Sequence, residues 1–124
     1  MIHLDTNFLI QALLPNSAAQ TKLQSWLEGG EDVAISSIAW SEFLCGPLTF
    51  EDEQLARDIV AEPEPFLALD AQKAAELFNV SGRRSRSLAD CQIAAVALRC
   101  GARVATANAS DFTPFQNHGL MIVP

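Results

Sequence analysis

Three acidic residues and one amide stand where their side-chain oxygens are available for chemistry. Asp5 and Asn108 each follow a short apolar segment, whereas Glu42 and Asp90 lie within apolar stretches that have helical spacing. Carboxylate and amide oxygens are the ligands that Mg²⁺ and Mn²⁺ prefer. If these side chains meet around such a cation, the site could activate water and stabilise charge on a phosphate group during in-line displacement.

Each of these residues also has an ordinary structural explanation. Asp5 can cap the helix that follows it, and Asp90 can interact favourably with the dipole at the start of its helix. Asn108 can be a turn residue, and Glu42 can be a solvated side chain at the rim of the core. Taken singly, none of the four residues establishes a site.

Glu42 is the most unusual of these residues because its helical neighbours are apolar. On a helix it shares a face with Ile38 and Cys45, so we expect it to point toward the core or into a cleft. No Lys or Arg occurs between Lys22 and Arg57 to pair with it locally. A buried carboxylate without a partner is costly, so pairing, protonation or a metal ion would be needed if it is buried.

The apolar pattern predicts an α/β protein with a mostly parallel, roughly five-stranded sheet and helices on both faces, a three-layer α/β/α arrangement. Acids at strand ends then meet at the carboxyl edge of the sheet, where open α/β folds bind ligands. We expect a helix from about residue 8, strands at 2–4, 33–35, 66–69, 103–106 and 120–123, and further helices at 17–28, 38–45, 51–61, 70–80 and 88–100.

Composition narrows the class of protein. The 124 residues suit a single domain spanning 1–124. The formal net charge of −7 argues against binding of nucleic acid through an overall positive charge. No apolar run reaches membrane-spanning length and no signal segment is present, so we expect a cytoplasmic protein. The cysteines form no CxxC pair and are expected to be buried free thiols: Cys45, Cys91 and Cys100.

Positive charge is concentrated in one loop. Arg83, Arg84 and Arg86 are three of only eight Lys and Arg residues, and they precede Asp90. Such a run can be a solvated loop. Beside a site that acts on phosphate, it can instead contact the backbone of RNA.

Four short motifs that contain the candidate residues occur in a fixed order along the chain. They are Leu4-Asp5-Thr6-Asn7, Ser41-Glu42-Phe43, Leu88-Ala89-Asp90-Cys91-Gln92-Ile93-Ala94-Ala95 and Val104-Ala105-Thr106-Ala107-Asn108-Ala109-Ser110-Asp111-Phe112. In order and spacing, over essentially the whole chain, this set resembles PIN-domain ribonucleases, and in particular VapC-like toxins of type II toxin–antitoxin pairs.

This resemblance implies a role for each site residue. Asp5, Glu42 and Asp90 would bind Mg²⁺ or Mn²⁺ and carry catalysis, while Asn108 stands where the family often has Asp. That neutral residue puts tight binding of a second ion in doubt. Auxiliary groups in or behind the site would be Thr6, Thr106, Asn108 and Asp111.

The implied activity is metal-dependent endonucleolytic cleavage of RNA by the toxin of a toxin–antitoxin pair. An antitoxin protein and a second copy of the chain would be its partners, with candidate interfaces around Trp40, Phe43 and Leu44 or in residues 9–27. An alternative is a degenerate PIN module that binds RNA or a protein without cleaving, which Asn108 leaves open.

Two other phosphate-directed classes fit poorly. A phosphoaspartate phosphatase needs a second acid two residues after Asp5, and Asn7 stands there. A receiver domain needs paired acids after the first strand and a lysine after a late strand, and no lysine follows Lys73.

Overall fold

Four short strands form one parallel sheet in the order β2-β1-β3-β4. The computed structural model describes residues 1–124. The two central strands, β1 and β3, pair from Ile2 with Arg103 to Leu4 with Ala105. The strands are β1 (Ile2–Leu4), β2 (Val33–Ala34), β3 (Arg103–Ala105) and β4 (Met121–Ile122).

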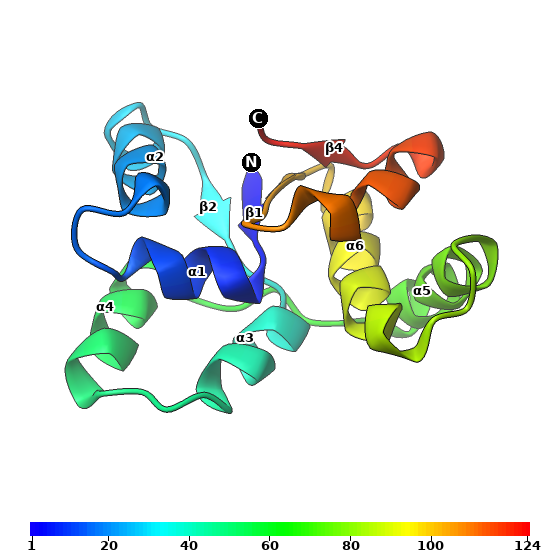
Figure 1. Cartoon of the computed structure of the whole chain (residues 1–124), viewed down its shortest axis with the longest axis horizontal. Coiled ribbons are helices and arrows are strands. Elements are labelled where there is room, and N and C mark those ends of the chain that lie inside the picture. The colour runs from blue at the N-terminus through cyan, green and yellow to red at the C-terminus, as the bar shows by residue number, and fades with distance from the viewer.

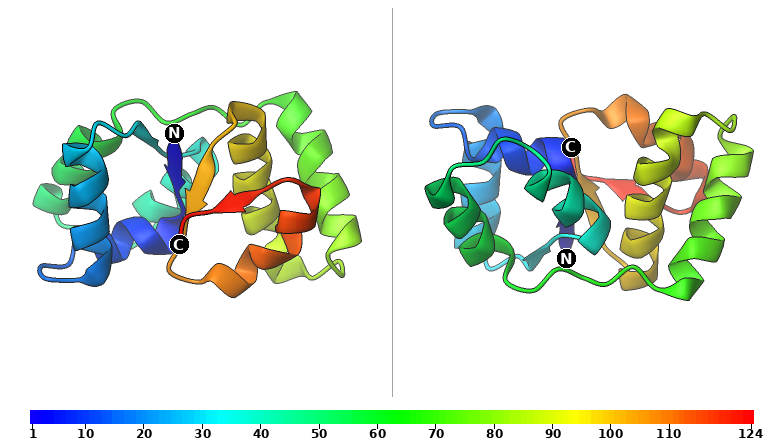
Figure 2. Two further views of the ribbon diagram at one scale, coloured as in Figure 1. Left: turned by 90° about the horizontal axis from the view of Figure 1, so that it is seen from above. Right: turned by 90° about the horizontal axis from the view of Figure 1, so that it is seen from below.

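Helices lie on both sides of this sheet, with α1 and α2 on one side and α5 and α6 on the other (Figures 1 and 2). None of the helices combines the length and apolar character needed to cross a bilayer. The α-helices are α1 (Thr6–Ala12), α2 (Ala18–Glu28), α3 (Ser37–Leu44), α4 (Phe50–Val60), α5 (Ala68–Val80) and α6 (Leu88–Cys100); short 3₁₀ helices are η1 (Ser85–Ser87), η2 (Ala109–Asp111) and η3 (Thr113–His118).

Capping residues set where these helices begin and end. Asp5, Ser17, Ser36 and Thr49 precede α1, α2, α3 and α4, and the side chain of each accepts a hydrogen bond from a backbone N–H. Gly101 ends α6 with a φ of 65°, which glycine adopts without the steric cost that a Cβ imposes. The cap predicted at Asp5 is therefore present.

The core is centred on β1 and on the small residues of α6. Ile2 and Leu4 of β1 are fully buried, as are Ala94 and Ala97 of α6. Alanines let α6 approach its neighbours closely, and α5 and α6 form the most extensive contact between any two elements. Of the three free cysteines, only Cys91 is fully buried, and the expectation that Cys45 is buried is wrong because it is exposed.

The α/β class and the parallel sheet are confirmed, but the sheet has four strands and not five. The strand expected at 66–69 is wrong, since α5 already begins at Ala68 and Leu69 is 65% exposed. Asp70 lies in the first turn of α5 and accepts the backbone N–H of Leu67. A short apolar run cannot by itself distinguish a strand from the first turn of a helix.

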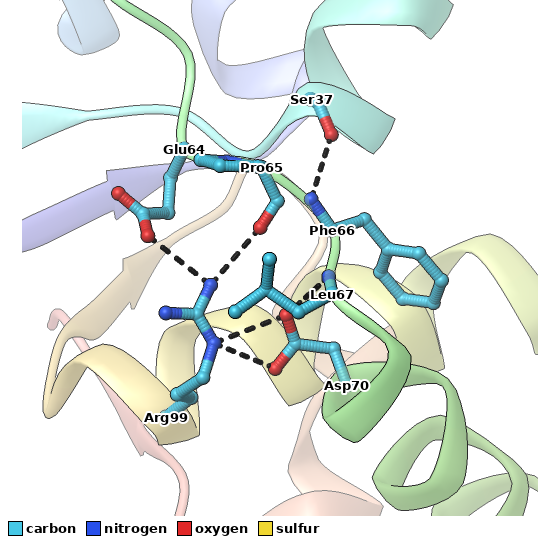
Figure 3. Close-up of polar contacts among 7 residues, drawn as sticks. All are labelled: Ser37, Glu64, Pro65, Phe66, Leu67, Asp70 and Arg99. Atoms are coloured by element: carbon cyan, nitrogen blue, oxygen red, sulfur yellow. Dashed lines mark hydrogen bonds and ion pairs between the residues drawn. The ribbon is translucent and has the colours of Figure 1, made fainter.

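One arginine near the end of α6 ties three segments together (Figure 3). The Nε of Arg99 donates to both carboxylate oxygens of Asp70, at 2.9 and 3.1 Å, and its Nη2 donates to the carbonyl of Pro65 at 3.0 Å. The same Nη2 lies 3.1 Å from a carboxylate oxygen of Glu64. The Asp70 side chain is only 1% exposed, so this pair holds a buried charge.

The segment that Arg99 holds is also bonded to the start of α3. Glu64 donates its N–H to the carbonyl of Ile35 and accepts the N–H of Ser37, while the Ser37 hydroxyl accepts the N–H of Phe66. Figure 3 shows the bond between Ser37 and Phe66. Polar contacts therefore connect the end of α6 to the start of α3, the helix that carries Glu42.

Removing Arg99 should destabilise the fold, because it would leave the Asp70 carboxylate buried without its cationic partner. We expect Arg99→Met to lower the free energy of unfolding by about 3–5 kcal/mol in urea denaturation. Lys73→Met is the matched control, since Lys73 forms an exposed pair with Glu76, and should cost less than about 1 kcal/mol. Equal losses in the two variants would contradict the account of this clamp.

Candidate active site at the carboxyl edge of the sheet

The carboxyl ends of β1 and β3 form the point where the connections of the sheet diverge. After β1 the chain goes to β2 on one side, and after β3 it goes to β4 on the other. Such a switch point leaves a crevice beyond the strand ends, where open α/β folds bind ligands. Asp5 directly follows β1, and Thr106 directly follows β3.

Asp5 is held rigidly in this crevice. Its residue is 5% exposed, one carboxylate oxygen accepts the N–H of Phe8 at 2.7 Å, and the other accepts the hydroxyl of Thr106 at 2.5 Å. Burial raises the pKa of Asp5, the two hydrogen bonds oppose this rise, and the charges of Asp111 and Glu42 add to it. The carboxylate is therefore a helix cap and, at the same time, a bridge between the ends of two strands.

Glu42 is exposed on α3 and does not enter the core. Its Oε1 accepts the hydroxyl of Thr6 at 2.8 Å, which directs the carboxylate toward the strand ends. A small cavity of about 90 Å³ brings Asp5, Thr6, Glu42 and Asp90 together. The core position considered for Glu42 is wrong; the residue is exposed, as expected for a rim position, and it lines the small cavity.

Asp90 lies in the first turn of α6 and is partly buried. Burial is the main reason that its pKa rises to about 7, and the charges of Asp111, Glu42 and Asp5 raise it further. Asp90 lines the small cavity and also a larger neighbouring one. The structure therefore brings the three acids into one electrostatically coupled group.

No cation balances this group. None of Asp5, Glu42, Asp90 or Asp111 belongs to any of the ion pairs in the structure. No three Asp, Glu, His or Cys side chains are arranged so that they could hold one metal ion together. The acids share one crevice, but their side chains do not form a closed coordination shell.

The remaining residues expected at the site lie around the larger cavity, which has a volume of about 800 Å³. Asn108 donates its backbone N–H to the Thr106 hydroxyl at 2.9 Å, which links the loop after β3 to the strand end. The structure does not place Arg83 in this cavity. The expected residues that line it are Arg84, Arg86, Asp90, Asn108 and Asp111.

Some residues at the site were not anticipated from the sequence. Asn7 and Ile93 line the small cavity, and Ser85 and Ser87 line the large one. Asn7 could have been found, because it lies in the first turn of α1, two residues after Asp5. Asp111 was expected as an auxiliary residue, and among the neighbouring carboxylates its charge contributes most to the raised pKa values of Asp5 and Asp90.

The fold and the crevice together define a parallel α/β protein with an acidic site at its switch point. Residues 2–113 match the PIN domain family, so the chain belongs to that family. The resemblance drawn from the motifs is thus confirmed. No curated protein matches the chain.

Solved structures share this fold over nearly the full chain. FitAcB from Neisseria gonorrhoeae is 24% identical with a TM-score of 0.76, covering 100% of this chain and 97% of that one. A toxin–antitoxin complex from Klebsiella pneumoniae is 25% identical with a TM-score of 0.73, covering 91% of each chain. VapBC2 from Rickettsia felis, bound to a DNA fragment from their promoter, is 24% identical with a TM-score of 0.71, covering 99% and 98%.

The raised pKa of Asp90 predicts how stability depends on pH. Folded Asp90 keeps its proton up to about pH 7, whereas an unfolded Asp loses it near 3.8, so the folded state is weakened as pH rises between these values. In EDTA, Asp90→Asn should raise the free energy of unfolding by about 1–3 kcal/mol at about pH 8, with no gain near pH 4.

The control for this titration is Asp58→Asn, which removes an exposed acid of α4 and should change stability little at either pH. Urea denaturation across the pH range measures all three proteins. A gain for Asp90→Asn that is the same at both ends of the range would contradict the assigned pKa.

Proposed function

We propose that this protein is a metal-dependent endoribonuclease that acts as the toxin of a toxin–antitoxin pair. The observation that carries the proposal is a group of four carboxylates without any paired cation, at the switch point of a PIN-family sheet. Such a group repels itself unless positive charge enters it. A divalent cation and the phosphate it recruits would satisfy that need.

The donor set fits Mg²⁺ or Mn²⁺ in its chemistry, because every polar group in the small cavity is a hard oxygen or an amide. Mg²⁺ usually keeps several waters and takes only one or two carboxylates directly. The lack of a closed three-residue shell is compatible with that mode. Asp5, Glu42 and Asp90 would hold the ion, which when bound supplies Lewis acidity and neutralises charge on the phosphate.

The residues of this chain have distinct parts in the proposed site. Asp5 is oriented by Phe8 and Thr106, so its carboxylate needs no rearrangement to accept a ligand. Thr6 orients Glu42 in the same way. With a pKa of about 7, Asp90 is roughly half protonated at neutral pH. A cation would compete with that proton, so cation binding should weaken as the pH falls.

The similar solved structures support an antitoxin as the partner, since two are described as toxin–antitoxin or VapBC assemblies. Unbalanced acids would also accept a cationic side chain from such a protein. Of the apolar residues expected at interfaces, Trp40 and Phe43 are buried and stack on each other. Exposed Ile10, Leu14 and Leu44 therefore remain as candidate contacts.

A catalytically degenerate PIN module is the second candidate. The observation that favours it is Asn108, which is neutral and exposed at the edge of the larger cavity. Asp111 places a carboxylate three residues later in the same cavity, so the loss of charge at Asn108 is offset locally.

Nuclease assays on single-stranded and structured RNA distinguish these two candidates. With Mn²⁺ we expect cleavage that EDTA abolishes, and Asp5→Asn or Asp90→Asn should lower the rate more than about 100-fold, because each removes a proposed ligand. Asp58→Asn serves as the matched control and should keep the wild-type rate.

Cleavage that persists in EDTA and in both site variants would overturn the proposed mechanism. RNA binding without cleavage under any metal condition would instead favour the degenerate module. Circular dichroism and urea denaturation of each variant separate loss of chemistry from loss of folding.

The toxin role predicts an effect on growing cells. Induced expression in a bacterial host should arrest growth, because cleavage of cellular RNA stops translation, and Asp5→Asn at equal protein level should not. Colony counts and immunoblots after induction measure both quantities. Equal growth arrest by wild type and Asp5→Asn would show that any toxicity is independent of the site.

A further inference from the structure

The larger cavity next to the acids has an unusual lining. Its volume of about 800 Å³ is enough for a nucleotide, and its wall contains no hydrophobic residue. Arg84 and Arg86 come from the segment before α6, whereas Asn108 and Asp111 come from the segment after β3. Asp90 belongs to this cavity and to the small acidic one, so the two cavities adjoin.

The arginines before α6 differ from the other Lys and Arg side chains of the protein, because their side chains have no partner within the molecule. Arg57, Lys73, Arg99 and Arg103 each pair with a carboxylate. Lys22 donates to the carbonyl of Pro124. By contrast, the side chains of Arg83, Arg84 and Arg86 are exposed and form no ion pair.

Position separates these three arginines. Arg84 and Arg86 line the cavity, and Arg83 does not. Arg83 adopts a φ of 56° one residue after Gly82, where the chain turns out of α5. The same loop therefore offers two candidate contacts and a neighbouring arginine of equal charge as a built-in control.

The lining also indicates which part of a nucleotide can be bound there. Proteins hold unstacked bases on aromatic or apolar side chains, and none is present in this cavity. Guanidinium groups bind phosphate oxygens, and hydroxyl or amide groups bind sugar oxygens. The available chemistry is thus directed at the sugar–phosphate backbone.

We propose that this cavity is a backbone subsite that holds the nucleotide next to the cleaved linkage by its phosphate, through Arg84 and Arg86, without reading its base. The inference rests on the proposed action on RNA, because the adjoining acids must receive the scissile phosphate. It adds that this acidic protein binds RNA, a polyanion, through one small basic site. Sequence preference, if there is any, then arises elsewhere on the surface.

Equilibrium binding of short fluorescent polyuridine and polyadenosine RNAs tests this subsite. The measurements use Asp5→Asn protein with Mg²⁺, so that the RNA stays intact, and fluorescence anisotropy between about 50 and 200 mM salt. We compare this background with Arg84→Gln/Arg86→Gln, with Arg84→Lys/Arg86→Lys and with Arg83→Gln.

The Gln pair should weaken binding of both RNAs about tenfold or more and lower the salt slope by about 1.4, since each lost phosphate contact in single strands contributes roughly 0.7. The Lys pair should keep most of the slope, because point charge is retained. Arg83→Gln should stay within about twofold of the background protein in affinity. The two RNAs should bind with similar affinity throughout.

Several outcomes would overturn the subsite. An unchanged slope in the Gln pair, or an equal effect of Arg83→Gln, would remove the two arginines from the RNA path. A preference between the two RNAs that disappears in the Gln pair would show that the cavity reads the base. If the Gln pair loses RNA binding but the wild type shows no metal-dependent cleavage, the proposed nuclease activity is contradicted. The role of Arg84 and Arg86 in binding the RNA backbone is then supported.

Discussion

Repulsion among carboxylates at one edge of the sheet is the constraint on which the rest of the structure depends. Burial is the main cause of the raised pKa values of Asp5 and Asp90, and the charges of Asp111 and Glu42 raise both further. Hydrogen bonds from Phe8 and Thr106 hold Asp5 in place, but none of the four acids forms an ion pair. A positively charged ligand at the switch point would reduce the repulsion among them.

The scaffold that maintains this arrangement lies at the far end of the helices. Arg99 and buried Asp70 join the end of α6 to the start of α5, and the segment around Glu64 is bonded in turn to the start of α3. On this side of the molecule, the positive charge of Arg99 is neutralised by the carboxylates that it holds in place. Free cations are confined to the loop before α6, which places the two signs of charge side by side at the edge of the sheet.

The sequence allowed the fold class and the meeting of the acids to be predicted, because both depend on local patterns. Apolar segments ending in Asp5 or Thr106, and an acid at the start of α6, place their side chains at a known edge once the strands are parallel. The strand expected at 66–69 is wrong because a short apolar run does not distinguish a strand from the first turn of a helix, and α5 begins at Ala68. Asp111 was expected as an auxiliary residue of the site, but the size of its effect on Asp5 and Asp90 could not be predicted, since spacing along a loop does not reveal distance in space.

X-ray diffraction at the manganese absorption edge, from crystals grown with Mn²⁺, is the most direct test of whether the acidic crevice is a metal site. An anomalous peak between Asp5, Glu42 and Asp90, absent from crystals of Asp5→Asn grown in the same way, is the expected result. A crevice without a peak at saturating Mn²⁺, or a peak only at some other place on the molecule, would contradict the account.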